Sequence, residues 1–396
     1  MPTVEIRRRQ LLRVALGAAT LGLLGRSSGP AFSPTSSSGG PAGRDCGSAS
    51  SPECSMSGSK AWIAAPLGQR LSAEERAFFA GERPYGFILF GRNIASGSQL
   101  SDLVAELRDV GGRESTPIFV DQEGGRINRL KPPLAPSYPT PADIGKLHAA
   151  DAEAGERAAW LQGRLLAADL MPYGINADCI PCVDVPVPGA NSVIGDRAYA
   201  ETPAAVAALG KAVAEGLMAG GVLPVMKHIP GHGRGNADSH HALPVVATSR
   251  DELARTDFAP FRALRALPAA MTAHILYSDI DASAPATLSP SVIGDVIRTE
   301  IGFDGLLMTD DMSMKALAGD LLDLGRRALE AGCDVLLHCN GEMDEMRRIA
   351  AAAGPLSGDA ERRARDAEAV IARGIAGARD DAAFRAEYQE LMSRIA

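Results

Sequence analysis

The sequence predicts an α/β fold, a single TIM-type (β/α)8 barrel, on three observations. Eight short apolar runs alternate with segments of helical periodicity between residues 61 and 338. Eight strand–helix units in one chain of this length close into a barrel of parallel strands. Polar residues with catalytic potential follow the ends of several runs. An open doubly wound sheet is the alternative, but no Gly-x-Gly-x-x-Gly motif follows an early run.

The apolar runs are the expected barrel strands, and they span 61–64, 86–90, 117–121, 176–185, 223–228, 269–274, 305–310 and 334–338. Helix-start signals lie between them. Ser72 and Glu75 have the spacing of a capping box. Thr202 and Ser289 each place a hydroxyl directly before a proline at the first helical position. Gly220, the first of a glycine pair, is expected to end the helix that begins after Thr202.

The charge distribution argues against a nucleic-acid partner. The chain has a net charge of −8, and residues 1–55 hold six arginines against three acidic residues. The remaining residues therefore carry −11, which repels a phosphate backbone.

No apolar segment is long enough to cross a bilayer, so we expect no stable membrane span. We expect the chain to act as a monomer.

The first residues predict a targeting segment and a linker. Arg8-Arg9-Gln10-Leu11-Leu12-Arg13 resembles a twin-arginine export motif, and a short apolar stretch follows it. We therefore expect a signal segment over 1–25, a disordered Ser/Gly/Pro-rich linker over 26–59 and the barrel domain with C-terminal helices over 60–396. Export would place the protein in the periplasm. The alternative is a cytoplasmic protein whose translation starts at Met56.

The six cysteines do not form a disulfide or metal-binding framework. Cys179 and Cys182 form a C-x-x-C, but they lie inside an apolar run and no second pair follows at zinc-site spacing. We expect buried, inert thiols there rather than a metal or redox site.

Residues 227–244 form the most informative segment, because they contain four of the seven histidines and three glycines. A long irregular loop over a barrel mouth is usually functional. A solvent-exposed His-rich loop and a metal site are possible, but no His-Glu-x-x-His spacing supports the metal. General acid/base catalysis fits better, because Asp238 lies two residues from His240 and can orient its imidazole.

Two further segments place carboxylates at strand ends. Asp310 ends the run 305–310 and is well placed as a nucleophile, whereas Asp311 can cap the next helix. Asp121 ends the run 117–121, where it can accept hydrogen bonds from sugar hydroxyls, and Arg129 adds a fork of donors.

Together these segments resemble glycoside hydrolase family 3, in particular its single-domain bacterial β-N-acetylhexosaminidases. The resemblance runs from about residue 62 to 350, and its most specific part is Lys227-His-Ile-Pro-Gly-His-Gly followed by Asp238-Ser-His240. It implies hydrolysis of terminal β-linked N-acetylglucosamine from anhydro-muropeptides in cell-wall recycling, with retention of configuration and without a metal or organic cofactor.

The resemblance also implies roles for individual residues. Asp310 matches the nucleophile, His240 the proton donor and acceptor, and Asp238 its carboxylate partner. The positions that match sugar contacts are Asp121, Arg129, Arg197, Lys227 and His228. We expect His232 to shape the loop rather than touch substrate, and His274 to lie at the floor of the site.

Several alternatives stay open. Within the same family these are a β-glucosaminide phosphorylase, in which phosphate replaces water, and a β-glucosidase. A metal-dependent barrel hydrolase would belong to a different class. A non-catalytic sugar-binding protein would leave Asp310 and the Asp238–His240 pair without a purpose.

Overall fold

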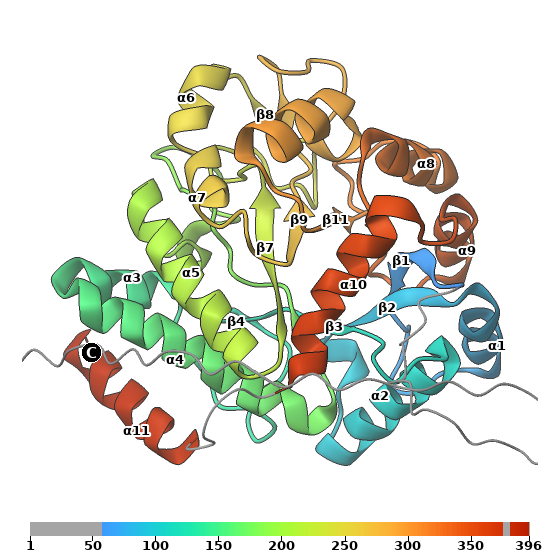
Figure 1. Cartoon of the computed structure of the whole chain (residues 1–396), viewed down its shortest axis with the longest axis horizontal. Helices are drawn as coiled ribbons and strands as arrows, with labels where there is room; N and C mark the ends of the chain where they lie inside the picture. The colour runs from blue at the N-terminus through green and yellow to red at the C-terminus, as the bar shows by residue number, and fades with distance from the viewer. Residues whose placement is uncertain (1–57, 375–380, 396) are drawn as a thin grey trace, which may run out of the picture. The chain divides into compact units, whose positions relative to one another are not determined.

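The computed structural model describes residues 58–374 and 381–395, and these residues confirm the predicted barrel (Figure 1). Eight parallel strands close on themselves in chain order, and β12 pairs with β1. The strands are β1 (Lys60–Ala64), β2 (Pro84–Leu89), β3 (Ile118–Val120), β6 (Ala177–Asp178), β7 (Leu223–Ile229), β9 (Ala269–Thr272), β11 (Leu306–Asp311) and β12 (Val335–Leu337).

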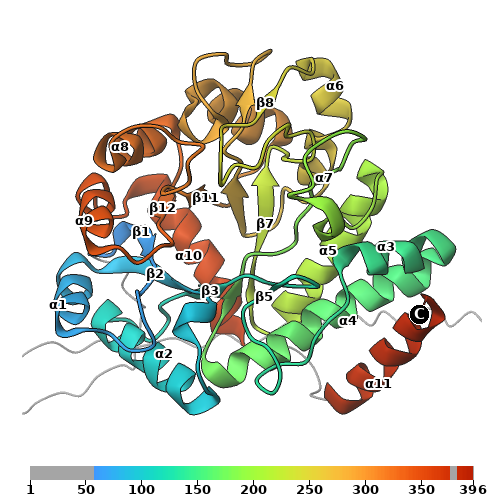
Figure 2. The same ribbon diagram turned by 180° about the vertical axis from the view of Figure 1, so that it is seen from behind.

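Helices surround the strands on all sides (Figure 2). They are α1 (Ala73–Glu82), α2 (Gly97–Gly111), α3 (Pro141–Ala150), α4 (Ala152–Leu170), α5 (Pro203–Ala219), α6 (Arg250–Arg255), α7 (Phe258–Ala263), a π-helix (Val292–Ile301), α8 (Leu321–Ala331), α9 (Met343–Ala352), α10 (Gly358–Arg373) and α11 (Asp381–Met392). Two small ribbons lie outside the barrel: β4 (Gln122–Gly124) with β5 (Ile127–Asn128), and β8 (Val245–Val246) with β10 (Leu276–Tyr277).

Each of the eight expected runs overlaps one barrel strand, but the fourth strand is much shorter than its run. Only Ala177–Asp178 pairs regularly, and the segment from 179 to 185 is irregular although it is buried. Pro181 has no N–H to donate to a ladder, which limits the strand. A single bridge between Cys182 and Lys227 keeps the irregular segment beside β7.

The expected helix signals are largely confirmed. Ser72 and Glu75 form the capping box at the start of α1, and the Ser289 hydroxyl accepts the Val292 N–H. Pro203 begins α5 as expected, but the Thr202 side chain makes no capping hydrogen bond. Gly220 is the C-terminal cap of α5.

The C-terminal helices pack on the barrel of their own chain. Helix α10 lies across the end of the barrel where the strands begin, the end facing the viewer in Figure 1. Its Arg363 binds Asp304 and Asp334, which directly precede β11 and β12. Helix α11 packs on α4, where the Tyr388 hydroxyl donates to Gln162. The opposite end of the barrel, where the strands finish, is therefore the one left open.

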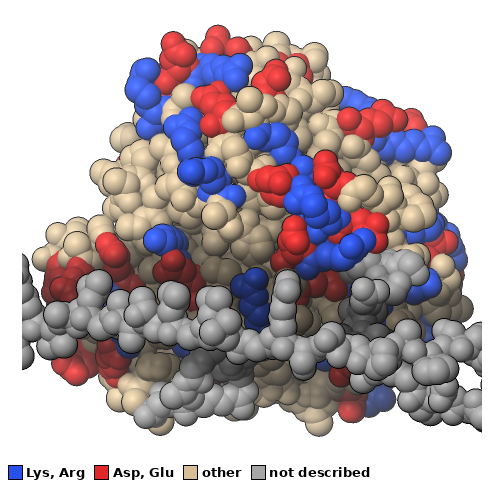
Figure 3. All heavy atoms as spheres, viewed as in Figure 1, with Lys and Arg blue, Asp and Glu red and all other residues tan. Residues whose placement is uncertain are grey.

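The face of the molecule on which α10 lies carries both positive and negative side chains. Figure 3 shows Lys and Arg interspersed with Asp and Glu over the face of Figure 1. Within the described ranges, no helix has the length and apolarity needed to cross a membrane. The twin-arginine-like segment, nearly all of the Ser/Gly/Pro-rich linker and Met56 lie outside the described residues.

The anchoring of α10 leads to a stability prediction. Asp334 is almost fully buried and binds Arg298 at 2.8 Å, Arg363 at 3.0 Å and the Leu307 N–H. Because Asp334→Ala leaves two half-buried guanidinium groups without this partner, we expect it to lower the free energy of unfolding by about 3 kcal/mol. Urea denaturation measures this loss.

Asp304→Ala is the matched control. Asp304 also binds Arg363, but its side chain is 66% exposed. Water screens such a pair, so the expected loss is below about 1 kcal/mol. Equal losses for the two variants would contradict the account.

Candidate active site

A pocket of about 160 Å³ opens at the end of the barrel where the strands finish. Side chains from the ends of several strands meet there with side chains of the loop that follows β7. The pocket brings together seven of the eight predicted site residues: Asp121, Arg129, Arg197, Lys227, His228, His240 and Asp310. The eighth, Asp238, lies behind His240 and binds its imidazole.

A network of buried charges forms one wall of the pocket. Lys227 Nζ lies 2.8 Å from Asp121 Oδ1 and 2.8 Å from Glu123 Oε1. Arg129 binds the other oxygen of Asp121 at 3.0 Å. Arg197 binds both oxygens of Glu123, at 2.9 and 2.8 Å. The two carboxylates and three cations therefore hold one another in place.

This network keeps both carboxylates ionised. Burial raises the pKa of Asp121, but Lys227 and Arg129 more than offset it and hold the pKa well below its usual range. In the same way Lys227 and Arg197 lower the pKa of Glu123 to about 2 against the opposing effect of burial. Burial lowers the pKa of Lys227, but Asp121 and Glu123 outweigh it and raise that pKa. The wall carries fixed charges at neutral pH.

Asp310 differs from every other carboxylate that lines the pocket. One of its oxygens accepts the N–H of Asp311 at 2.8 Å. Within the described residues, no Lys, Arg or His makes an ion pair with it. Asp311 lines the pocket too, but Ser313 and the Cys339 N–H occupy both of its oxygens. Asp310 thus keeps one oxygen free to react.

The backbone beneath Asp310 is held by His274. Its Nε2 donates to the Asp311 carbonyl at 3.0 Å, and its Nδ1 lies 2.7 Å from the Thr287 hydroxyl. His274 was expected at the floor of the site, but it is completely buried and is not part of the pocket lining. Burial raises the pKa of Asp310, but His274, His228 and the Asp311 N–H outweigh it, so the pKa is lowered.

The Asp238–His240 pair has the geometry of an oriented acid/base group. Asp238 Oδ1 lies 2.7 Å from His240 Nδ1 and accepts the His240 N–H at 2.9 Å. Burial raises the pKa of Asp238, but its hydrogen bonds with His240 together outweigh this effect and lower the pKa below the usual value. His240 is exposed, whereas Ser239 between the two is buried and its carbonyl accepts the Ala316 N–H at 3.1 Å.

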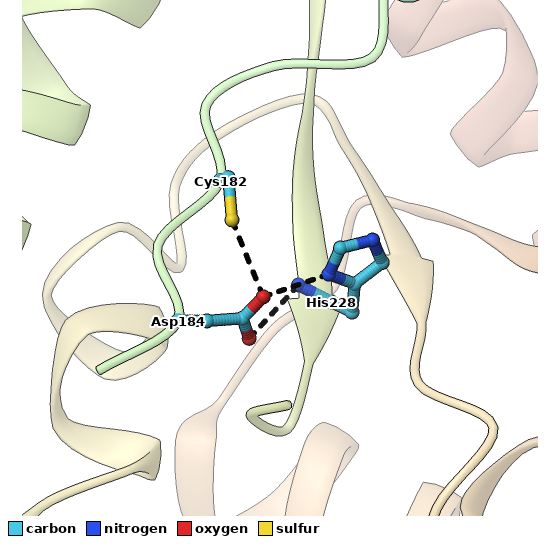
Figure 4. Close-up of side chains that lie close together, drawn as sticks. All are labelled: Cys182, Asp184 and His228. Carbon is cyan, nitrogen blue, oxygen red and sulfur yellow. Dashed lines mark hydrogen bonds and ion pairs between the residues drawn. The ribbon is translucent and has the colours of Figure 1, made fainter. Parts of the chain in front are cut away.

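His228 and Asp184 form a second pair, in which Asp184 is fully buried and His228 nearly so (Figure 4). Asp184 Oδ2 lies 2.7 Å from His228 Nδ1, and the Cys182 thiol donates to the same oxygen at 3.3 Å. Asp184 Oδ1 accepts the backbone N–H of His232 at 2.6 Å. His232 shapes the root of the loop as expected, but its side chain also lines the pocket.

Cys182, Asp184 and His228 are close enough together to be tested as a metal site. Two ligands of a tetrahedral zinc ion are separated by about 3.4 Å, given metal–ligand distances of about 2.1 Å. The 2.7 Å between Asp184 and His228 is instead a hydrogen-bond distance. The cluster therefore fits a satisfied buried carboxylate better than an ion. Cys179 and Cys182 are both buried, as expected for inert thiols.

Sequence reasoning missed two residues of this site, Glu123 and Asp184. Charge balance could have indicated Glu123. The cations Lys227, Arg129 and Arg197 need more than one buried carboxylate, and Glu123 lies two residues after Asp121. Asp184 is a carboxylate inside an apolar run, which by itself predicts a buried group with partners. Asp121 was expected to accept hydrogen bonds from sugar hydroxyls, and the structure adds that each of its oxygens also binds a cation.

Comparison with known proteins decides the family. Residues 59–371 match the model described as the glycosyl hydrolase family 3 N-terminal domain, which is most of the chain. This chain belongs to glycoside hydrolase family 3. As a member of that family it is a glycoside hydrolase, an enzyme that acts on carbohydrate.

Relatives of this family 3 enzyme carry related names. A β-hexosaminidase of Methylococcus capsulatus is 41% identical over 278 residues, covering 69% of this chain and 81% of that protein. One of Alkalilimnicola ehrlichii is 39% identical over 280 residues, covering 69% and 78%. NagZ from Neisseria gonorrhoeae, solved with N-trifluoroacetyl-D-glucosamine, superposes with a TM-score of 0.75 at 32% identity, covering 85% of this chain and 97% of that one. This likeness supports β-N-acetylglucosaminidase activity.

The charge network predicts a pH-dependent loss of stability for Glu123→Gln. Glu123 is 1% exposed and its pKa is lowered to about 2 from 4.5. A group whose pKa is lowered on folding stabilises the protein above its unfolded pKa, and this stabilisation disappears as the pH falls. We therefore expect a loss of about 3 kcal/mol at pH 7, following about 1.4 kcal/mol per pKa unit.

Urea denaturation at pH 7, 5 and 4 measures this effect against the natural chain. The difference between the two proteins should shrink as the pH falls below about 4.5, because Glu123 of the unfolded chain then takes up a proton whereas the folded group stays ionised down to about pH 2. Glu215→Gln is the control, since Glu215 is half exposed and lies 3.7 Å from Lys211. A constant difference at all three pH values would contradict the assignment.

Proposed function

We propose that this family 3 enzyme is a retaining exo-β-N-acetylglucosaminidase that removes terminal β-linked N-acetylglucosamine from peptidoglycan anhydro-muropeptides. The observation that carries the proposal is the free oxygen of Asp310 in a pocket whose other carboxylates are fully engaged. The N-trifluoroacetyl-D-glucosamine bound by the gonococcal relative supports the choice of sugar.

In the first step Asp310 is the nucleophile. Its free oxygen forms a bond to the anomeric carbon while the bond from that carbon to the aglycone oxygen breaks. His240, protonated on both nitrogens, gives its Nε2 proton to the departing oxygen. The products of this step are a glycosyl ester on Asp310, the free aglycone alcohol and a neutral His240.

In the second step water attacks the same carbon. His240 Nε2 takes a proton from the water as the new bond forms, and the ester bond to Asp310 breaks. Two inversions give net retention of configuration, and Asp310 and His240 return to their starting states. The separation rule for paired carboxylates does not apply, because one partner is a histidine on a loop.

Asp238 makes His240 suitable for both steps. Its carboxylate accepts the Nδ1 proton of His240 at 2.7 Å, so the proton that moves is the one on Nε2. The negative charge also stabilises the imidazolium that the first step requires. Asp238 therefore acts through His240 and has no need to touch the sugar.

The fixed charges of the wall bind the sugar hydroxyls in this proposal. Lys227 and Arg129 keep donors beyond those that Asp121 and Glu123 accept, and Arg197 keeps donors beyond those used on Glu123 and on the Val193 carbonyl. Together with Asp121 and His228 they offer donors and acceptors in fixed positions. Such preformed groups orient a ring at little cost in reorganisation.

His240→Ala tests the acid/base assignment. We expect turnover of a substrate with a poor leaving group to fall by about a hundredfold or more, because the departing alkoxide is no longer protonated. A nitrophenyl glycoside needs little protonation, so its glycosylation step should fall much less. The measurement is kcat/KM for both substrates at several pH values.

His241→Ala is the matched control. His241 is exposed and follows His240 in the chain, but its contact with Asp238 is a distant one of 4.0 Å. It should retain near-normal rates. The same assays with and without phosphate should give free N-acetylglucosamine at equal rates. Normal turnover of the poor leaving group by His240→Ala would overturn the assignment, and phosphate-dependent formation of a sugar phosphate would indicate a phosphorylase.

A further inference from the structure

Asp184 is a buried charged residue to which the proposed mechanism assigns no step. It has no exposed surface, and it lies on the irregular segment that follows β6. Four donors reach its carboxylate: the imidazole and N–H of His228, the N–H of His232 and the thiol of Cys182. This single side chain therefore links a sugar-facing residue to the root of the catalytic loop.

The hydrogen bonds fix which nitrogen of His228 carries a proton. Burial raises the pKa of Asp184, but His228, His232 and their hydrogen bonds outweigh it and hold the pKa well below its usual range. An ionised carboxylate can only accept hydrogen bonds, so the 2.7 Å contact requires the proton on His228 Nδ1. In a neutral imidazole the other nitrogen, Nε2, is then an acceptor.

The position of His228 directs that acceptor towards the substrate. His228 lines the pocket, and its Nε2 makes no hydrogen bond to any described protein atom. Figure 4 shows this nitrogen on the side of the ring that faces away from Asp184. The ring is also packed against that of His232, whose centroid lies 5.6 Å away, so it has little freedom to turn.

We propose that Asp184 is a positioning residue that fixes the tautomer of His228, so that Nε2 accepts a hydrogen bond from one hydroxyl of the bound sugar. The inference rests on the proposed function, because it assumes a sugar in this pocket. It adds a requirement for specificity: at the contacted position the sugar must carry a group that donates a hydrogen bond. A substituent that can only accept is then rejected.

Asp184→Asn should reverse this requirement. The backbone N–H groups of His228 and His232 both donate to Oδ1, so the Asn oxygen takes that place and its NH2 group takes the place of Oδ2. The NH2 group can only donate, which requires His228 Nδ1 to accept and moves the proton to Nε2. The pocket then presents a donor where the natural enzyme presents an acceptor.

The experiment measures competitive inhibition by N-acetylglucosamine and by its 3-, 4- and 6-deoxyfluoro analogues. Fluorine has no proton to donate, so one analogue should bind the natural enzyme about tenfold or more weakly, the cost of an unpaired buried polar group. We call this loss of affinity relative to N-acetylglucosamine the penalty. In Asp184→Asn the penalty for that same analogue should fall below about threefold. Penalties at the other two positions should stay unchanged.

Cys182→Ala is the matched control. Its side chain contacts the same carboxylate oxygen but makes no hydrogen bond to His228. It should keep the full penalty of the natural enzyme. Equal penalties in the natural enzyme and Asp184→Asn, or loss of the penalty in Cys182→Ala, would overturn the proposal.

A measurement that does not depend on turnover separates this inference from the proposed function. In ¹⁵N-histidine NMR of the natural protein, His228 should show a protonated Nδ1 and an unprotonated Nε2, and Asp184→Asn should show the reverse. If Asp184→Asn does not fold, the spectrum of the natural protein alone decides. A proton on Nε2 in the neutral ring of the natural protein would reject the inference even if the enzyme hydrolyses its substrate as proposed.

Discussion

The active site depends on one constraint, that a carboxylate buried at the rim of the barrel must be compensated. An isolated buried charge costs several kcal/mol, so such groups survive only with partners. Asp121, Glu123 and Asp184 each have at least two. Asp310 has the N–H of Asp311 and the nearby His274 and His228, but no cation in direct contact. Our proposal that Asp310 is the nucleophile rests on this difference.

The barrel topology brings these groups together. Parallel strands all finish at the same rim, so Asp121 after β3, Lys227 on β7 and Asp310 on β11 meet although nearly two hundred residues separate the first from the last. Helix α10 covers the opposite end. The strands hold the charged wall and Asp310, the proposed nucleophile, whereas the exposed Asp238–His240 pair lies on a loop, which in our proposal adjusts to the substrate.

Sequence reasoning recovered the parts of the structure that depend on local patterns. The eight apolar runs each overlap a barrel strand, and the predicted site residues line or adjoin one pocket. It failed where the outcome depends on partners distant in the chain. The irregular segment after β6 could not be distinguished from a strand by hydrophobicity alone. The ion pair between Asp121 and Lys227 was not predicted either, because it joins residues 106 positions apart.

The same reason explains why Glu123 and Asp184 were overlooked. Both lie in segments that drew attention for other residues, and their roles appear only when their partners are known. The cations that Glu123 balances come from β7 and from the loop before α5. A count of buried charges by sign, applied to the predicted strand ends, would have indicated a missing carboxylate beside Lys227, Arg129 and Arg197.

The central claim, that Asp310 is the nucleophile because its oxygen is free, is tested most directly by trapping the glycosyl-enzyme. The protein is incubated with a 5-fluoro N-acetylglucosaminyl fluoride, whose ester intermediate is hydrolysed slowly, and its peptides are sequenced by mass spectrometry. The account predicts one sugar per chain, attached to Asp310. A sugar on Asp311 or another residue, or turnover of the reagent with no label at all, would contradict it.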